Sequence, residues 1–290
     1  MKKIIIFVIL LFVFSSCTSD YDKRLKISAT TWVGYTPLFY AKAKGWLKPL
    51  NIKLVNISSL AENMYLYSAG NADAYVGTQY EYGILSKDMK SLSPIMMFDK
   101  SNGGDLVMSN FSIEELQNTA SPLDVYLELD SINHTLFKDF ISKYNLSDKT
   151  INYINRDQST IKLLKSNDKP TLIVTYVPYN FTLEKNGFKE VSSTKNNLDL
   201  LVVDAMFTKI EVFNQHEKQF LELKKLIDKS ILALKKDPKE FYNTIKPYMT
   251  GITYDEFEDT LNDIEWINSK MSDGLKERLN VSGFPTRDLI

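Results

Sequence analysis

Short apolar runs alternate with helix-like segments between residues 25 and 98, and this alternation limits the possible folds more than any other feature of the chain. The apolar runs that predict strands cover 25–29, 52–57, 72–76 and 93–98. Helical segments are predicted between them, at 37–47, 62–68 and 80–86. A repeat of strand and helix favours a parallel sheet that is covered by helices.

A second series of the same kind follows. Its predicted strands cover 123–127, 151–154, 172–175 and 200–203, and its predicted helices cover 131–144, 158–166 and 179–186. From 207 to 280 the pattern is helical, with an apolar stripe formed by Phe220, Leu223, Ile227, Ile231 and Leu234. The 290 residues are 44% hydrophobic, which is enough for two cores of ordinary size. The sequence therefore predicts an α/β protein with two lobes, a cleft between them and helices near its C-terminus.

The N-terminus has the pattern of an export signal. Two lysines precede an apolar run of eleven residues, 4–14, which is too short to span a bilayer of ~30 Å comfortably. The run ends at Phe14-Ser15-Ser16-Cys17, which resembles a bacterial lipobox. Cys17 is the single cysteine of the chain, so the alternative is a stray unpaired thiol in an exported protein. We predict a lipoprotein signal peptide at 1–16, acylation of Cys17 by chains such as palmitate, a polar tether at 17–24, and an extracytoplasmic location at the membrane.

Several short segments resemble, in their order, those of a known family of binding proteins. Their sequences are WVGYTPL at 32–38, AKAKGWL at 41–47, SAGNADA at 68–74, SNGGD at 101–105, YVPY at 176–179 and LLVVD at 200–204. This order is similar to that of the solute-binding proteins of ABC importers for nitrate, sulfonates, taurine and thiamine precursors, which are type II periplasmic binding proteins. The chain departs from the family pattern at 113–117, where IEELQ stands in place of the expected "dLkGK".

The resemblance implies a particular division of the chain. Lobe 1 would comprise 25–105 and 205–290, lobe 2 would comprise 106–204, and each lobe would contain a mostly parallel sheet flanked by helices. It also implies a monomeric receptor that delivers a small molecule to an ABC permease, with no catalytic residues, cofactor or metal.

The opening stretch of the predicted first lobe has the composition of a ligand-binding wall. Ligands of open α/β sheets bind beyond the carboxyl ends of the strands, which is where residues 31–36 follow the first strand. Trp32 and Tyr35 offer flat apolar faces with one polar group each, and Gly34 permits close backbone approach. The alternative is that both aromatic residues only cover the core of the lobe.

Other candidate ligand-binding residues lie at strand ends, at the first crossover or at the start of a helix of lobe 2. They are Thr78, Gln79, Tyr80, Ser101, Asn102, Asp105, Ser131, Asn133, Tyr176 and Asp204. Free N–H groups at the helix start near Ser131 would suit an anionic ligand group, although Thr78 and Ser131 are also ordinary helix N-caps. Glu81 and Glu128 are expected to be solvated.

Charge indicates which ligands the predicted cleft favours. The chain has a net charge of −1, which gives no reason to expect nucleic acid as a partner. It contains only four arginines, the residue that most often grips oxyanions, although an AT-rich genome would also favour lysine over arginine. Asp105, Asp204 and the aromatic residues favour an amine, a zwitterion or a cationic ring, provided that the acids point into the cleft.

Two other functions compete with import. A two-lobed receptor could instead dock on a membrane signalling protein, and nothing in the sequence separates these outputs. An enzyme related to thiamine-pyrimidine or menaquinone synthesis would share the fold. However, the chain has two histidines and contains no metal-binding, nucleophile-elbow or phosphate-loop motif, so we expect no enzyme activity.

Overall fold

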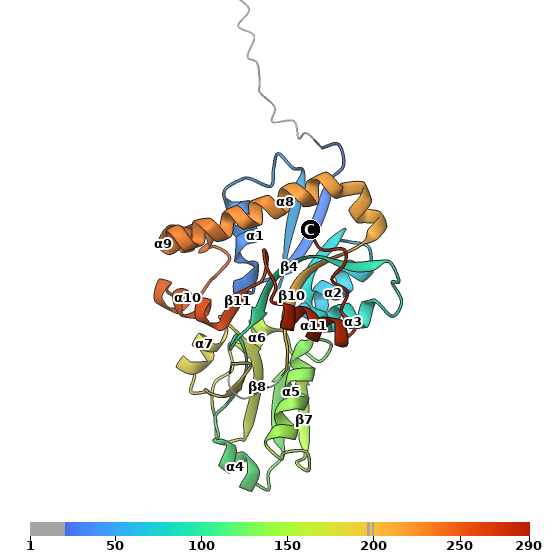
Figure 1. Ribbon diagram of the computed structural model, residues 1–290. Helices are drawn as coiled ribbons and strands as arrows, with labels where there is room; N and C mark the ends of the chain where they lie inside the picture. Colours follow the sequence, from blue (N-terminus) through green and yellow to red (C-terminus); the bar gives the residue numbers. More distant parts are fainter. Residues whose placement is uncertain (1–20, 196–197, 199) are drawn as a thin grey trace, which may run out of the picture.

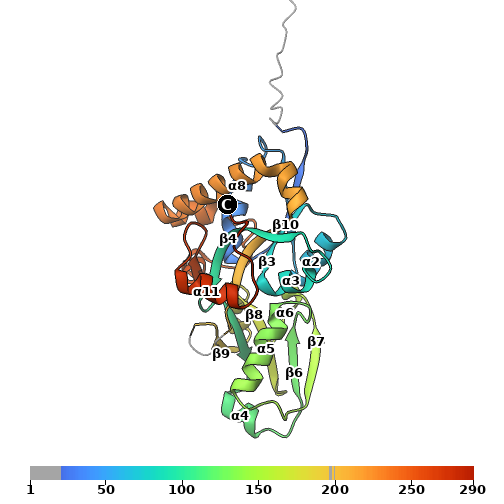
Figure 2. The same cartoon turned by 45° about the vertical axis from the view of Figure 1, so that its right-hand side comes forward.

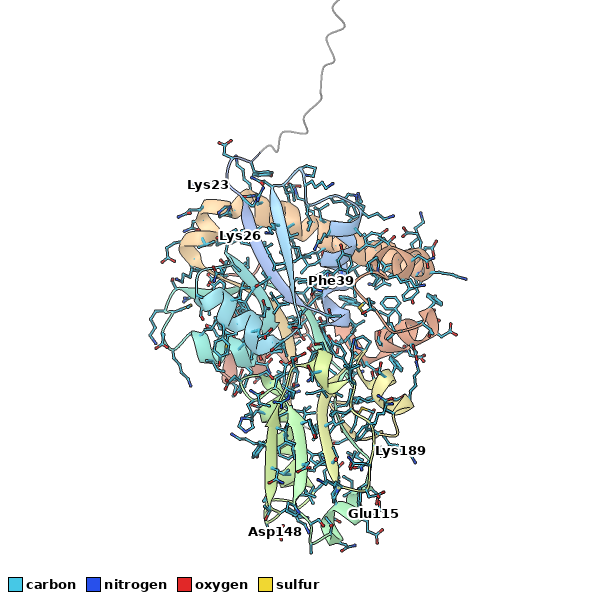
Figure 3. The ribbon with its side chains drawn as sticks, turned by 180° about the vertical axis from the view of Figure 1, so that it is seen from behind. Lys23, Lys26, Phe39, Glu115, Asp148 and Lys189 are labelled. Carbon is cyan, nitrogen blue, oxygen red and sulfur yellow. The ribbon has the colours of Figure 1, made fainter. Side chains whose placement is uncertain are left out.

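The computed structural model describes residues 21–195, 198 and 200–290, which form two lobes stacked along one axis (Figure 1). Lys23 and Lys26 lie at the far end of lobe 1, and Glu115 and Asp148 lie at the far end of lobe 2 (Figure 3). The predicted signal peptide and Cys17 lie outside the described residues. Within the described ranges, no helix combines the length and the apolar character needed to cross a membrane.

Lobe 1 is built on a six-stranded sheet in the order β11-β4-β10-β3-β1-β2. The strands are β1 (Leu25–Thr30), β2 (Ile52–Ile57), β3 (Ala74–Thr78), β4 (Leu92–Ser101), β10 (Val203–Lys209) and β11 (Ile264–Trp266). β1 pairs in parallel with β2 and β3, whereas β10 is antiparallel to both β3 and β4, and β11 is antiparallel to β4. The last residues of β1 and β3, Thr30 and Thr78, lie close to Tyr176 at the end of a strand of lobe 2. In Figure 2, β3 lies in the lobe above the strands labelled β6, β7 and β8.

The helices of lobe 1 come from both ends of the chain. They are the short η1 (Val33–Tyr35), α1 (Thr36–Ala43), α2 (Leu60–Ser68), α3 (Gln79–Leu85), α8 (Ile210–Lys236), α9 (Pro238–Ile245), α10 (Tyr254–Thr260), η2 (Leu261–Asp263) and α11 (Asp273–Val281). The predicted apolar stripe of α8 is buried against α1 and the sheet, as its helical spacing indicates. Ser59 and Thr78 cap α2 and α3 through their side chains.

Lobe 2 contains a five-stranded sheet in the order β7-β6-β8-β5-β9. Its strands are β5 (Asp105–Ser109), β6 (Leu123–Leu127), β7 (Ile151–Asn155), β8 (Thr171–Tyr176) and β9 (Lys189–Ser193). Its helices are α4 (Ile113–Asn118), α5 (Ile132–Lys143), α6 (Gln158–Ile161) and α7 (Asn180–Lys185). β6 is parallel to β7 and β8, and β5 is antiparallel to β8 and β9. The predicted two-lobed α/β fold is confirmed.

The sheets are mixed, whereas mostly parallel sheets were predicted. Each crossover is followed by a strand in the lobe that the chain has just entered: β5 in lobe 2 and β10 in lobe 1. Both strands run antiparallel to their neighbours in the sheet. The prediction also lacked β5, β9, β11 and α4, and it placed helix at 207–209, where β10 continues. Three of these elements are short and border a crossover or a sheet edge, where the local pattern carries little information.

The chain passes between the lobes at two neighbouring places, from Ser101 to Asp105 and again between β9 and β10. The predicted boundary at 105 falls at the first residue of β5, and β10 begins at Val203, before the predicted return at 205. The Ser101 and Thr194 hydroxyls are 2.9 Å apart and join the two passages. One hydrophobic cluster continues from lobe 1 into the nearer half of lobe 2, through residues such as Leu106 and Ile132.

Candidate functional site: a buried acidic cavity between the lobes

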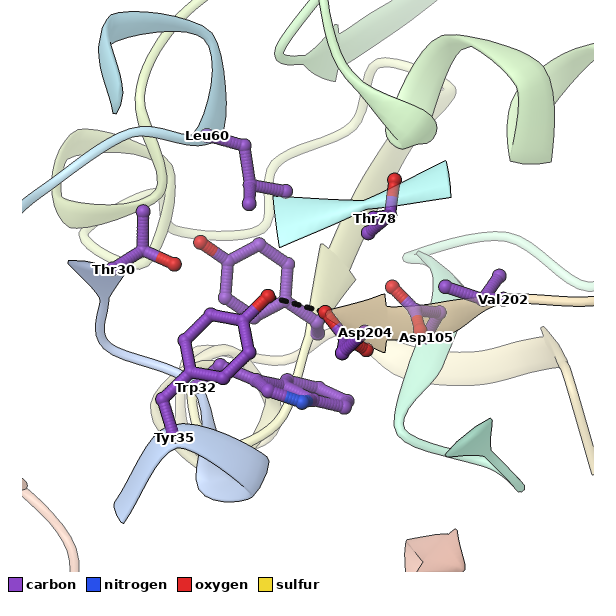
Figure 4. Close-up of a pocket in the computed structure, with 9 residues that line it drawn as sticks. Thr30, Trp32, Tyr35, Leu60, Thr78, Asp105, Val202 and Asp204 are labelled. Carbon is purple, nitrogen blue, oxygen red and sulfur yellow. Dashed lines mark hydrogen bonds between the residues drawn. The ribbon is translucent and has the colours of Figure 1, made fainter. Parts of the chain in front are cut away.

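A narrow cavity lies where the two sheets meet. Its lining comes from strand ends and adjoining loops of both lobes and consists of Thr30, Trp32, Tyr35, Leu60, Thr78, Asp105, Tyr176, Val202 and Asp204 (Figure 4). Thr30 and Thr78 end parallel strands of lobe 1, and Tyr176 ends a strand of lobe 2. The cavity therefore occupies the position in which open α/β sheets bind ligands.

Trp32 forms one wall of this cavity and is also tied to the protein interior. Only 5% of the residue is exposed, and its indole N–H donates to Asp99 Oδ1 over 3.0 Å. Its ring meets that of Tyr176 edge to face, with centroids 5.8 Å apart. Glycine at position 34 makes this arrangement possible, because a Cβ there would lie 1.8 Å from Asp99 Oδ2 and 2.6 Å from the indole nitrogen. The two predicted roles of Trp32, wall and core, are thus compatible in geometry.

Tyr35 and Asp204 bring the two halves of the lobe 1 sequence together. The Tyr35 hydroxyl donates to Asp204 Oδ1, which lies at the start of β10 and opposite Thr78 of β3 (Figure 4). The Tyr35 ring packs edge-on against Phe98. The helix predicted at 37–47 begins one residue earlier, at Thr36, whose hydroxyl donates back to the Val33 carbonyl.

Five buried carboxyl groups surround the cavity: Asp99, Asp105, Asp204, Glu81 and Glu128. Burial raises the pKa of Asp99 to about 8, with a further contribution from the charge of Asp105. Burial raises the pKa of Asp105 to about 7 and that of Asp204 well above its usual range. Desolvation of charged carboxylates and their mutual repulsion therefore act together, and both favour the protonated forms.

Within the described residues, no buried basic side chain compensates these acids. Among residues 21–195, 198 and 200–290, no lysine or arginine is buried. His216 is buried, but its Nδ1 is 2.6 Å from Gln219 Oε1 on α8, away from the cavity. An uncompensated group of buried carboxyl groups is costly for the protein alone, and a cation among them would relieve that cost.

Several buried polar atoms at the site have no hydrogen-bond partner. Within the described part of the chain these include the Thr30 hydroxyl, the Tyr176 hydroxyl and Asp99 Oδ2. Buried polar groups are normally paired, so each of these is available to a ligand or to water. In the same part of the chain, no group of three or more His, Cys, Asp or Glu side chains has an arrangement that could hold a metal ion.

Half of the predicted ligand-binding residues line the cavity. These are Trp32, Tyr35, Thr78, Asp105, Tyr176 and Asp204. The other six support its surroundings or the crossovers instead: Gln79, Tyr80, Ser101, Asn102, Ser131 and Asn133. Ligand binding by any of them remains a prediction.

The six residues outside the cavity lining have identifiable partners. The Gln79 amide bonds the backbone of Leu201 and Val203 at the return passage. The backbone N–H of Tyr80 donates to the Thr78 hydroxyl, and the backbone N–H of Asn102 donates to the Asp263 carbonyl.

Three further residues hold elements in place. The Ser101 hydroxyl accepts from the Asp105 amide, the Ser131 hydroxyl caps α5, and Asn133 Oδ1 accepts from Gln158. The carboxyl-end rule therefore located the cavity but could not tell lining residues from those just behind them.

Sequence reasoning missed Thr30, Leu60, Val202 and Asp99, and it expected Glu81 and Glu128 to be solvated. Both glutamates are instead buried at the contact between the lobes. The pattern Thr78-x-x-Glu81 was a usable signal, because a capping box turns its glutamate back toward the helix start. Asp99 offered no local signal, since its position under Trp32 depends on strand pairing.

The fold and the cleft define a class: this chain has the fold of the periplasmic binding proteins, in which two α/β lobes enclose a binding cavity. No family model matches the sequence, and no curated protein matches it. The likeness is one of fold, shared with solved structures that are 10–12% identical in sequence.

Three solved structures illustrate the likeness. A ligand-binding component of an ABC-type import system from Staphylococcus aureus, with zinc bound, is 12% identical with a TM-score of 0.72, and the match covers 89% of this chain and 90% of that one. The alkanesulfonate-binding protein SsuA from Xanthomonas axonopodis, bound to MOPS, is 10% identical with a TM-score of 0.67, covering 92% and 98%. The nitrate-binding protein NrtA from Synechocystis is 12% identical with a TM-score of 0.62, covering 80% and 68%.

Proposed function

We propose that this protein is a monomeric, extracytoplasmic solute-binding receptor that captures a small organic cation between its lobes and delivers it to an ABC permease. The fold is that of binding proteins, and the solved relatives described above include binding components of import systems. The cavity lies between two lobes joined at neighbouring passages, which is the arrangement required for closure around a ligand.

The choice of ligand rests on the five buried carboxyl groups, near which the described part of the chain places no buried lysine or arginine. Asp105 and Asp204 line the cavity itself, and Trp32, Tyr35 and Tyr176 add aromatic faces. An ammonium group or a cationic ring would pair with the acids and contact the rings, gaining ~0.5–2 kcal/mol for each cation–π contact. A bare oxyanion would meet only negative or neutral groups. We therefore favour an amine, a zwitterion or a cationic ring.

A thermal-shift screen of the wild-type protein tests the ligand class. Polyamines, choline-like ammonium compounds, pyrimidine and thiazole precursors, sulfonates and nitrate are compared at equal ionic strength. A cationic ligand at a hundredfold its dissociation constant should add about 2.7 kcal/mol of stability. Stabilisation by sulfonates or nitrate and not by any cation would contradict the proposal.

The location follows from the N-terminal segment, which lies outside the described residues. We infer that Cys17 is acylated and anchors the receptor to the membrane, facing the periplasm in a Gram-negative cell. Cys17→Ser should release the protein from membranes or leave the signal peptide uncleaved, as judged by fractionation and by the mass of the mature chain. Membrane association and maturation equal to those of the parent would show that the cysteine carries no anchor.

A further inference from the structure

Two helices begin at the contact between the lobes, one in each lobe. α2 of lobe 1 starts at Leu60 after its cap Ser59, and α5 of lobe 2 starts at Ile132 after its cap Ser131. The first amide groups of a helix have no partner within the helix, and the macrodipole places partial positive charge there. Such helix starts are general binding sites for anions.

The start of α2 is already occupied by an acidic side chain of the protein. Glu128 follows β6 in lobe 2, and its Oε2 accepts hydrogen bonds from the Leu60 amide at 2.9 Å and the Ser59 hydroxyl at 3.2 Å. Its Oε1 accepts from the Gln158 amide of its own lobe at 3.2 Å. The two carboxyl oxygens of Glu128 therefore accept hydrogen bonds from different lobes.

The start of α5 is occupied in the same way from the opposite side. Glu81 of lobe 1 accepts from the Ile132 amide of lobe 2 through Oε1 at 3.1 Å. Its Oε2 accepts from the Thr78 amide and hydroxyl of its own lobe, at 2.7 and 2.6 Å. Glu81 and Glu128 are only 1% and 2% exposed. The two contacts are reciprocal, with each lobe sending one carboxylate to a helix start of the other.

We propose that Glu81 and Glu128 are specificity-determining residues that act as built-in anions, filling both helix starts at the contact between the lobes so that the closed receptor excludes anionic ligands. This inference rests on the proposed function, because it concerns the ligand selected by the same cleft. Leu60, the first residue of α2, lines the cavity. The start of α5 lies behind the lining, and Glu81, which fills it, is bonded to the lining residue Thr78.

The exclusion has two physical causes. An incoming sulfonate or nitrate would have to displace a carboxylate from its amide donors, and the displaced group would remain close to other buried acids. The anion would also approach Asp105 and Asp204, and their carboxylates would repel it. A cation faces neither obstacle, since it pairs with the aspartates while the glutamates keep the lobes together.

The test vacates one helix start and asks whether an anion takes the vacant place. Binding of sodium methanesulfonate and sodium sulfate is measured by calorimetry and thermal shift on wild type, Glu128→Ala and Glu62→Ala. The measurements are made at pH 8.5, above the pKa of about 7 of Glu128, so that this group is ionised, and ionic strength is held constant by sodium chloride. Glu62 is the matched control, because it lies in the first turn of α2 and is exposed. Glu128→Ala should bind the anions roughly tenfold or more tightly than the other two proteins, the order expected for a charge-assisted hydrogen bond gained.

A folded Glu128→Ala variant that binds both anions no better than Glu62→Ala would overturn the inference, as would saturable anion binding by wild type. If circular dichroism shows that Glu128→Ala is unfolded, Glu128→Gln is measured instead, and the same gain is expected because a neutral amide can be displaced without burying a charge. Failure of the cation screen on wild type would contradict the proposed function alone, because the anion experiment uses different ligands and compares variants.

Discussion

At the scale of single residues, Trp32 combines a ligand wall with a structural contact. The sequence predicts a ligand-binding wall for this residue, with cover of the lobe core as the alternative. The structure adds its burial, its membership of the hydrophobic cluster and its bond to Asp99, so truncation must also affect stability. The indole ring and the indole N–H can be separated by substitution.

We predict that Trp32→Ala lowers the free energy of unfolding by about 3 kcal/mol or more and weakens binding of a cationic ligand, because both the packing and the wall are lost. Trp32→Phe keeps a flat face and should lower stability by only about 1–2 kcal/mol, since Asp99 loses its donor. Urea unfolding and calorimetric titration measure the two effects. An alanine variant as stable as wild type would place the ring outside the core.

Asp204 offers a test in which stability and binding change in opposite directions. Its carboxyl group is buried among other acids, and burial raises its pKa. Asp204→Asn should therefore leave the protein as stable as wild type or more so at pH 8, while it weakens binding of a cation by roughly 2 kcal/mol or more, as expected when a buried charge partner is removed.

Asp263→Asn is the control for Asp204→Asn, because its carboxylate pairs with Lys195 at 3.5 Å and does not line the cavity. Equal ligand affinities of the two variants would remove Asp204 from the binding site.

At the scale of elements, the turn η1 depends on close approach at Gly34. Its Cα faces the Asp99 carboxylate and the indole nitrogen of Trp32, and no side-chain atom fits between them. The turn thus carries Trp32 and Tyr35 into the cavity only because residue 34 lacks a side chain.

We predict that Gly34→Ala lowers the free energy of unfolding by about 1–3 kcal/mol, since the added methyl group must displace Asp99 or Trp32. Gly274→Ala in α11 is the control: nothing lies within 4 Å of its Cβ position, and alanine should leave stability unchanged or raise it. Thermal unfolding of both variants decides the point, and similar melting temperatures would show that η1 adapts freely.

At the scale of the whole molecule, the buried acids determine how stability depends on pH. The pKa is about 8 for Asp99 and about 7 for Asp105 and Glu128, whereas an unfolded chain has carboxyl pKa values of about 4. Between these values the folded protein holds protons that the unfolded chain has lost. The stabilising contribution is therefore complete below about pH 4 and is lost as pH rises through 7 and 8.

We predict that the protein without added ligand is more stable in urea at pH 5.5 than at pH 8.5, and that Asp99→Asn reduces this difference. Cation affinity should change in the opposite sense and increase with pH, because the carboxyl groups must lose protons to pair with the ligand. A protein that is more stable at pH 8.5 would contradict the assignment of these groups as buried and uncompensated.

The lobes themselves are expected to move as units about the two passages near Ser101 and Thr194. We predict that a cation found in the screen reduces the radius of gyration in small-angle scattering. Glu128→Ala should enlarge that radius without ligand, because a cross-lobe bond is lost. Identical scattering with and without a saturating ligand would exclude closure as the binding mechanism.

The sequence alone determined the α/β class, the two lobes and the cleft. It also gave the starts of six helices to within two residues: α1, α2, α3, α5, α6 and α7. Strand and helix periodicity and capping residues such as Ser131 are local, so they can be recognised from neighbouring positions. The carboxyl-end rule then located Trp32 and Tyr35 at the cavity, because it depends only on strand direction. Asp204 was predicted at the end of a strand at 200–203, but it lines the cavity from the start of the antiparallel strand β10.

Only the tertiary structure decided which strands pair, and with them the character of the site. The sheets are mixed because β5 and β10 follow the two crossovers and pair antiparallel with their neighbours. Hydrophobic periodicity does not encode the direction in which a strand pairs. Glu81, Asp99 and Glu128 look like ordinary polar residues in the sequence, and the last of them meets Leu60 from 68 positions away. Whether a charged side chain is buried, and which group it contacts, depends on long-range packing. This packing places acidic side chains around the cleft and directs two of them to helix starts.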